Sequence, residues 1–167
     1  MNARLNSRRQ VSADAMSAAE EIAVLDQARA LQSAARDGTT RPMLRGKNFG
    51  LLCESEDQPE AILFRRAAHG LGAHVAYIRP SLSEGSPPSE VQHTARLLGR
   101  LYDAVECQGT SQALAPRIGA EAGVPVYGGV ASAFHPTARL AAVLGDDDAS
   151  ENNRCFVIQA VLLTTVG

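Results

Sequence analysis

The chain has 167 residues, which suits one ordinary domain with a buried core. Its formal net charge of −2 and its aromatic content of 4% argue against a basic, base-stacking surface, so we expect no nucleic-acid partner. Its apolar runs are far shorter than the roughly 20 residues that cross a bilayer, so we expect no membrane span. Three cysteines without a Cys-x-x-Cys pair predict free, mostly buried thiols in a reducing cytoplasm, with a metal site as the less favoured interpretation and no cofactor.

Hydrophobic periodicity predicts helices and strands that alternate along most of the chain. Residues 1–11 are polar and expected to be flexible, and an amphipathic helix follows over 12–35, with Ile22, Leu25, Ala28 and Leu31 on its apolar side. The predicted strands are 49–53, 74–78, 103–107 and 124–127, and the predicted helices that follow them are 59–71, 89–101, 110–122 and 135–144. A last helix is predicted from about residue 151, with Phe156, Ala160, Leu163 and also Val157 on its apolar side. Strands joined by crossover helices imply an α/β fold: a three-layer, four-stranded parallel sheet flanked by helices.

Several short motifs stand at the ends of these elements. They are Leu44-Arg45-Gly46-Lys47, Leu71-Gly72-Ala73-His74, His93-Thr94-Ala95-Arg96, Val124-Pro125-Val126-Tyr127-Gly128-Gly129 and Phe134-His135-Pro136. In content, order and spacing, from about residue 44 to 144, they resemble the carbamoyl-phosphate-binding domain of the aspartate and ornithine carbamoyltransferases. The resemblance implies that family's domain fold and a one-carbon transferase ancestry.

The end of the chain carries a second part of the resemblance. Glu151-Asn152-Asn153-Arg154 and the residues 159–167 resemble the family's last helix, which returns from a second, amino-acid-binding domain to pack on the first. The resemblance therefore implies that residues 12–167 form a single domain. Residues 146–150 would be a short bridge in place of the missing second domain, and 151–167 a helix that packs back.

The family binds phosphate with a Ser-Thr-Arg-Thr-Arg motif after its first strand. The matching positions here read Asp57-Gln58-Pro59-Glu60-Ala61, so both arginines are absent and two carboxylates are present. A carboxylate close to a phosphate repels it, and a bidentate arginine contact is lost. Asp57 and Glu60 have capping-box spacing, which favours a plain helix cap over a catalytic role. The less favoured alternative is that these carboxylates form an acidic site that binds a cationic ligand.

Two further family sites are altered to different degrees. An Arg-Thr pair after the third strand corresponds to Gln108-Gly109, and an amide brings no charge. His135-Pro136 matches the family His-Pro, whose histidine helps to polarise the carbamoyl carbonyl, but the family Gln nearby is Ala138. His135 is thus the one retained family position, either as a ligand contact or as a helix start. Gln58, Gln108 and His135 are the candidate ligand-binding residues, and no catalytic residue is assigned.

Three functions remain open at this point. The favoured one is a non-catalytic assembly or interaction subunit with a degenerate site, which the resemblance implies would form a homo-oligomer, a trimer, and which could bind another protein. The first alternative is a small-ligand binding or sensing module that uses a pocket at the carboxyl ends of the strands. The second is a carbamoyltransferase that is inactive alone and needs a partner chain to complete its site.

Overall fold

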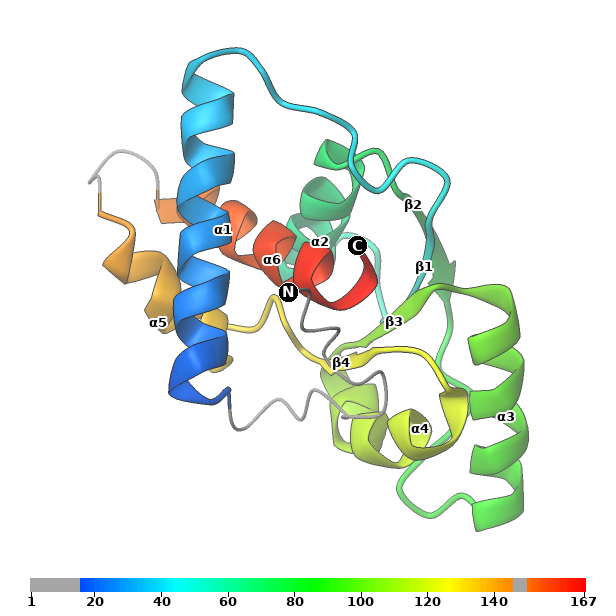
Figure 1. Cartoon of the computed structure of the whole chain (residues 1–167). Helices are drawn as coiled ribbons and strands as arrows, with labels where there is room; N and C mark the ends of the chain where they lie inside the picture. Colours follow the sequence, from blue (N-terminus) through cyan, green and yellow to red (C-terminus); the bar gives the residue numbers. More distant parts are fainter. Residues whose placement is uncertain (1–15, 146–149) are drawn as a thin grey trace.

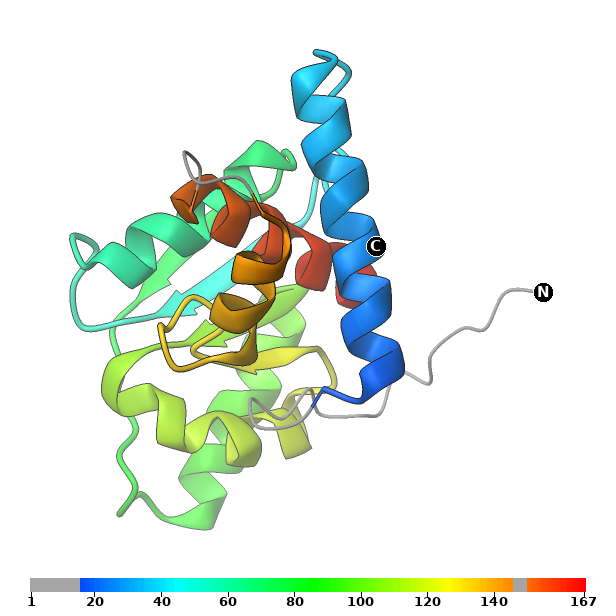
Figure 2. The same ribbon diagram turned by 90° about the vertical axis from the view of Figure 1, so that its left-hand side faces the viewer.

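The computed structural model of the protein describes residues 16–145 and 150–167. The predictions for residues 1–11 and for most of the bridge at 146–150 lie outside these ranges. Within them the chain is an α/β domain with a four-stranded parallel sheet between two layers of helices (Figures 1 and 2). This confirms the predicted fold class. None of the helices in these ranges is both long and apolar enough to cross a membrane.

The elements follow the predicted order closely. They are α1 (Ala18–Arg36), β1 (Asn48–Leu52), α2 (Pro59–Gly70), β2 (His74–Ile78), α3 (Pro88–Leu101), β3 (Ala104–Cys107), the 3₁₀ helix η1 (Gly109–Leu114), α4 (Ala115–Ala122), β4 (Val126–Gly128), α5 (Pro136–Val143) and α6 (Ser150–Val166). The one helix predicted over 110–122 is in fact two elements. Pro116 lies in the first turn of α4, where a residue without an N–H is tolerated, so the α-helix starts there and not earlier.

The sheet separates two hydrophobic cores because side chains alternate between its faces. Phe49 and Leu51 of β1 point toward the layer that contains α1, α2, α5 and α6, whereas Leu52 points toward α3 and α4. Figure 1 shows α3 and α4 together on one side of the sheet, with the other helices on the opposite side. All three cysteines are free and buried, as predicted.

Helix α6 is the central element of the larger layer, and its predicted apolar residues lie in or against the core, but its buried surface is wider than the predicted stripe. The six consecutive residues 157–162 are all buried, and at 3.6 residues per turn they cover every side of the helix. The reason is that α6 is enclosed by α1, α2 and α5 together, and a helix buried on all sides is apolar on all sides.

Helix α1 buries most of its predicted apolar face, since Ala28 and Leu31 are in the core and Leu25 packs against it, but it departs from the prediction at one position and extends it at two. Ile22 is 60% exposed, whereas Val24 and Gln32 join Ala28 and Leu31 in the buried stripe. Gln32 is buried because its side-chain amide donates to Asn153 Oδ1 of α6 at 2.8 Å, a contact between distant segments that periodicity could not reveal.

Candidate functional site

The strand order places a topological switch point between the loops that leave β1 and β3. The order is β2-β1-β3-β4, so the chain turns in opposite directions from the adjacent strands β1 and β3. Helix α2, after β1, packs in one layer, and η1 and α4, after β3, lie with the other. Open α/β sheets bind their ligands at such a switch point, outside the carboxyl ends of the strands.

The N-terminal turn of α2 lies on one side of this switch point, and it corrects the predicted cap. The N-cap residue is Gln58, whose side chain makes no capping hydrogen bond, and the backbone N–H of Asp57 donates to Ser55 Oγ at 3.3 Å. The capping box of Asp57 and Glu60 is therefore absent. The cause is Pro59: the residue before a proline is disfavoured in the helical conformation, so Gln58 stays extended and the helix starts one residue later than a cap at 57 requires.

Carboxylates surround this turn. Glu54, Glu56 and Asp57 are exposed and Glu60 is half-buried. Thr110, from the loop after β3, donates to Glu54 Oε1 at 2.6 Å and does not cap the following helix. The loop between β1 and α2 is therefore acidic.

Gln108 forms the floor between the two loops. It is only 1% exposed, and its side-chain N–H donates to the backbone carbonyl of Glu60 at 3.1 Å. Its side-chain oxygen is buried without a hydrogen-bond partner, and so is the hydroxyl of Ser111, two acceptors that native proteins rarely leave unsatisfied. Gln108 therefore lies beneath the first turn of α2.

Glu106 is a buried acid that the sequence analysis missed. It is 0% exposed, and its Oε1 accepts hydrogen bonds from the backbone N–H groups of Gly129 and Val130 at 2.8 and 3.0 Å. Gly129 has φ +73°, and successive N–H groups at such a turn form a concavity that favours an anion. Burial nevertheless dominates and raises the pKa of Glu106 to about 8, against the opposing effect of these hydrogen bonds. A charged residue inside the apolar run Ala104-Val105-Glu106-Cys107 was the signal that could have revealed it.

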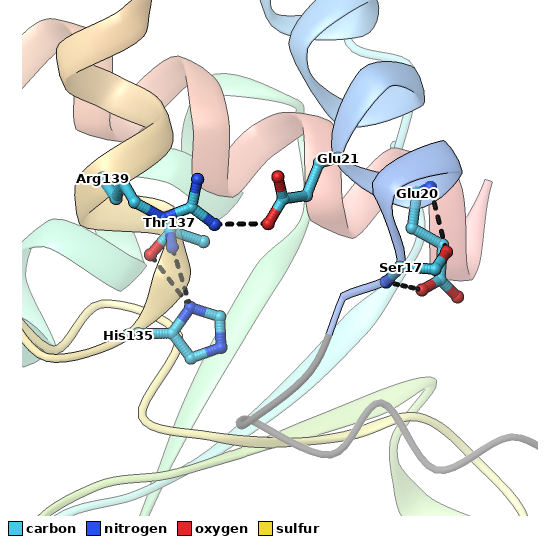
Figure 3. Close-up of polar contacts among 6 residues, drawn as sticks. All are labelled: Ser17, Glu20, Glu21, His135, Thr137 and Arg139. Carbon is cyan, nitrogen blue, oxygen red and sulfur yellow. Dashed lines mark hydrogen bonds and ion pairs between the residues drawn. The ribbon is translucent and has the colours of Figure 1, made fainter.

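His135 closes the edge at β4, and it is the N-cap of α5. The residue is 8% exposed, and Nδ1 accepts a hydrogen bond from the backbone N–H of Thr137 at 3.1 Å (Figure 3). The Thr137 hydroxyl donates to the carbonyl of Val130 at 2.7 Å, which fixes the turn. Because Nδ1 accepts, the neutral ring carries its proton on Nε2. The predicted role as a helix start is confirmed, and a ligand contact remains a prediction.

Two arginines lie near this edge, and neither replaces the lost pair. The side chain of Arg139 is 61% exposed and forms an ion pair with Glu21 of α1 (Figure 3). Arg154 of α6, which the sequence analysis did not single out, donates to the carbonyl of Ala131 at 2.7 Å, and its Nε is buried without a partner. Arg154 could have been found only by knowing that α6 returns to the β4 loop.

The candidate residues thus share an edge of the sheet but lie on three elements. Gln58 is exposed at the start of α2, Gln108 is buried after β3, and His135 is buried after β4. Over residues 16–145 and 150–167, no group of three or more His, Cys, Asp or Glu side chains could hold a metal ion. The chemistry available at the edge is that of carboxylates, amides, one imidazole and one partly buried guanidinium.

Comparison with known proteins places the domain in a family. The profile described as aspartate/ornithine carbamoyltransferase, carbamoyl-P binding domain, matches residues 8–145. The ornithine carbamoyltransferase of Actinobacillus pleuropneumoniae serotype 5b is 41% identical over 121 residues, which is 72% of this chain and 36% of that protein. The catabolic ornithine carbamoyltransferase of Burkholderia mallei is 38% identical over 144 residues, 86% of this chain and 43% of that protein. The chain therefore spans less than half the length of these curated relatives.

Solved structures give the same fold. The ornithine carbamoyltransferase of Pyrococcus furiosus superposes with a TM-score of 0.68 at 22% identity and covers 84% of this chain and 45% of that one. The aspartate transcarbamoylase of Trypanosoma cruzi in complex with N-(phosphonacetyl)-L-aspartic acid superposes with a TM-score of 0.62 at 21% identity, covering 84% of this chain and 45% of that one. On the strength of the profile match, this chain belongs to the aspartate/ornithine carbamoyltransferase family, and what it contains of that family is the carbamoyl-phosphate-binding domain.

Proposed function

We propose that this chain does not catalyse carbamoyl transfer by itself and works as an assembly or interaction subunit. The observation that carries the proposal is the composition of the turn where the family's phosphate motif stands. Pro59 and Ala61 replace its arginines, and Glu60 adds a carboxylate. Phosphoryl and acyl transfer both depend on donors that stabilise the developing negative charge, and this turn offers none with a positive charge.

Magnitudes support the loss of affinity for the dianion. A carboxylate about 4 Å from a unit negative charge costs roughly 1–4 kcal/mol, depending on solvent exposure. The N-terminus of an exposed helix favours an anion by only about 0.3–1 kcal/mol. With Glu54, Glu56, Asp57 and Glu60 around the start of α2, repulsion exceeds what the helix dipole supplies.

The connection between α5 and α6 supports the loss of the second domain. Helix α5 ends at Val143 and α6 begins at Ser150, so the intervening segment is too short to hold an amino-acid-binding domain. Helix α6 packs on α1, α2 and α5. We propose that residues 12–167 are one unit in which 146–150 bridge the position of the absent domain. The amino-acid substrate of the family then has no site in this chain.

The proposed role requires assembly. By its family resemblance we expect a cytoplasmic homo-oligomer, a trimer. We also expect that it could bind another protein. Size-exclusion chromatography with light scattering should give a mass of three chains at micromolar concentration. A monomer under those conditions would count against the assembly role.

The primary test is calorimetric titration of the purified chain with carbamoyl phosphate. We expect no heat of binding up to millimolar ligand, with circular dichroism showing a folded protein. A full-length ornithine carbamoyltransferase, titrated in the same buffer, is the positive control. Micromolar binding to this chain would overturn the proposal, because the anion site would then have been rebuilt from other residues.

Two alternatives each rest on a specific observation. The unpartnered hydroxyl of Ser111 supports a small-ligand binding module at the carboxyl edge. The retained His135 supports a carbamoyltransferase completed by a partner chain. Phosphate release that depends on ornithine or aspartate and arises only on mixing with a partner would establish the latter.

A further inference from the structure

Glu106 and Gln108 are neighbours on one face of β3. Side chains two residues apart on a strand share a face, and Glu106 is the register partner of Tyr127 on β4, so both side chains point into the larger hydrophobic layer. Gln108 extends from there to α2, where its side-chain N–H donates to the Glu60 carbonyl at 3.1 Å. The two residues therefore lie in series between β4 and the first turn of α2.

Two buried oxygens lie between these contacts, Oε2 of Glu106 and the side-chain oxygen of Gln108. Both are acceptors when Glu106 is ionised, so neither can satisfy the other. A proton on Oε2 satisfies both at once, because the carboxyl O–H then donates to the Gln108 oxygen. The two side chains are hydrogen-bonded to each other, and burial raises the pKa of Glu106 to about 8, so the proton is present at neutral pH.

This proton completes a chain of hydrogen bonds that runs in one direction. The Gly129 and Val130 N–H groups donate to Glu106 Oε1 at 2.8 and 3.0 Å. The Glu106 carboxyl donates to Gln108, and Gln108 donates to the Glu60 carbonyl. The loop after β4 is thus connected to the start of α2 through two buried side chains.

Loss of the proton forces a rearrangement at one of these side chains. Glu106 stays in place, because the backbone N–H groups that hold Oε1 favour its charged form. The Gln108 amide can respond, since a half-turn exchanges its oxygen and its N–H₂ group with little change of shape. Its N–H then donates to Glu106, and its oxygen faces the Glu60 carbonyl. Two acceptors then face each other, so the first turn of α2 loses its contact with β3.

We propose that Glu106 and Gln108 form a proton-operated switch, in which the protonated carboxyl keeps the Gln108 N–H on the first turn of α2 and loss of the proton rotates the amide and releases that turn. The charge change lies on Glu106, and the element with two states is the Gln108 amide. Alkaline pH therefore loosens the acidic loop between β1 and α2. The proposal goes beyond the assembly role and does not depend on it.

The titratable groups around Glu106 have other contacts or stay neutral. Tyr127 faces it from β4, and Cys107 points into the opposite core; burial raises the pKa of both, so both stay neutral to higher pH. Arg154 of α6 is bonded to the Ala131 carbonyl in the loop after β4. Strand β1 carries no titratable side chain. The remaining groups on the adjoining segments that the structure describes are Cys53 after β1, Glu60 on α2 and His135 before α5.

The test is a pH titration of the whole chain from pH 6 to pH 9, followed by nuclear magnetic resonance with carbon-13 and nitrogen-15 labels. The Cδ shift of Glu106 reports its ionisation, and the side-chain N–H₂ shifts of Gln108 report the amide. The Ile62 amide, which donates to the Gln58 carbonyl at 3.0 Å, reports the first turn of α2. We expect all three to change with one midpoint, near pH 8.

Helix α3 supplies a matched internal control. It also starts at a proline and has a glutamate in its first turn, and its Val91 amide donates to the Pro87 carbonyl at 3.2 Å. The Val91 amide should show no transition, which also shows that the domain stays folded across the range. A Val91 transition equal to that of Ile62 would mean a general effect of pH and would overturn the switch.

Two variants separate the proton from the amide that transmits it. Glu106→Gln cannot ionise, so the Gln108 and Ile62 signals should lose their transition. Gln108→Met keeps the length of the side chain without the amide, so Glu106 should still ionise while Ile62 no longer follows. An Ile62 transition that survives in Glu106→Gln would overturn the proposal, and this holds even if Gln108→Met does not fold.

The wild-type curves are decisive in two further ways. Ionisation of Glu106 without a transition at Ile62 would show that the proton is not transmitted to α2. A Glu106 signal that stays constant from pH 6 to pH 9 would show that the proton is not exchanged, and the proposal would fail. Either failure leaves the assembly role untouched, because that role is tested by carbamoyl phosphate and by molecular mass.

Discussion

Glu106→Gln is the most informative single change in this domain. Glutamine keeps the shape of the side chain, so its oxygen still accepts from the Gly129 and Val130 N–H groups. Its new side-chain N–H takes the place of the protonated Oε2 of the wild type and can keep the side-chain hydrogen bond with Gln108. We expect the variant to fold and to be more stable than the wild type at alkaline pH.

The magnitude follows from proton linkage. Burial raises the pKa of Glu106 from an ordinary 4.5 to about 8, so the folded chain holds a proton that the unfolded chain releases. The stability that this group contributes is complete below pH 4.5 and is lost as the pH rises toward 8. The full loss is about 5 kcal/mol, of which about 3 kcal/mol falls between pH 6 and pH 9.

Urea unfolding at pH 6, 7, 8 and 9 measures this loss. The free energy of unfolding of the wild type should fall relative to Glu106→Gln by about 3 kcal/mol over that range. Glu90→Gln, at an exposed position, is the control and should follow the wild type. Parallel curves for the wild type and Glu106→Gln would refute the reasoning, because Glu106 would then be ionised and fully compensated throughout.

Two further changes test the packing of the helices. A Cβ at Gly99 would lie 1.8 Å from the Ala122 carbonyl oxygen, so Gly99→Ala must separate α3 from α4. Thermal unfolding should show a loss of about 3 kcal/mol in stability. Gly85→Ala is the control: its Cβ would meet nothing closer than 3.8 Å, so it should cost less than about 0.5 kcal/mol. Asn153→Ala leaves the buried amide of Gln32 without its partner and should lower the free energy of unfolding by about 1–3 kcal/mol. The double variant Gln32→Leu/Asn153→Leu removes both polar groups and should be closer to the wild type in stability. A double variant as unstable as the sum of both single changes would show that the Gln32–Asn153 bond is not the relevant contact.

The fold was predictable because its signals are local. Strands β1 to β4 and their crossover helices are short apolar runs separated by turn residues, and each appears within a few residues of its predicted place. The errors arise where distant contacts decide. Ile22 continues the apolar spacing of α1 but faces solvent, while Gln32 is buried because Asn153 lies opposite.

The candidate site was harder to predict because its geometry depends on the backbone conformation of single residues. Asp57 and Glu60 have the spacing of a capping box, but Pro59 moves the helix start and removes the cap. Gln108 was named from the resemblance, yet its burial beneath the Glu60 turn follows from where α2 crosses β3. Glu106 and Arg154 lie in segments whose sequences are typical of a strand and of a helix. Only their contacts in the folded structure mark them as parts of the candidate site.

The position of Ala61 indicates why the phosphate turn is not simply a weakened copy of the family site. Ala61 stands where the resemblance places the second arginine, and it is 0% exposed in the larger hydrophobic core. An arginine there would have to displace core atoms or bury its charge, and either costs several kcal/mol. Gln108 meanwhile occupies the space under the first turn of α2. Recovery of an arginine site at this turn would thus require coordinated repacking, which is the structural basis for the proposed loss of carbamoyl-phosphate binding in an intact fold.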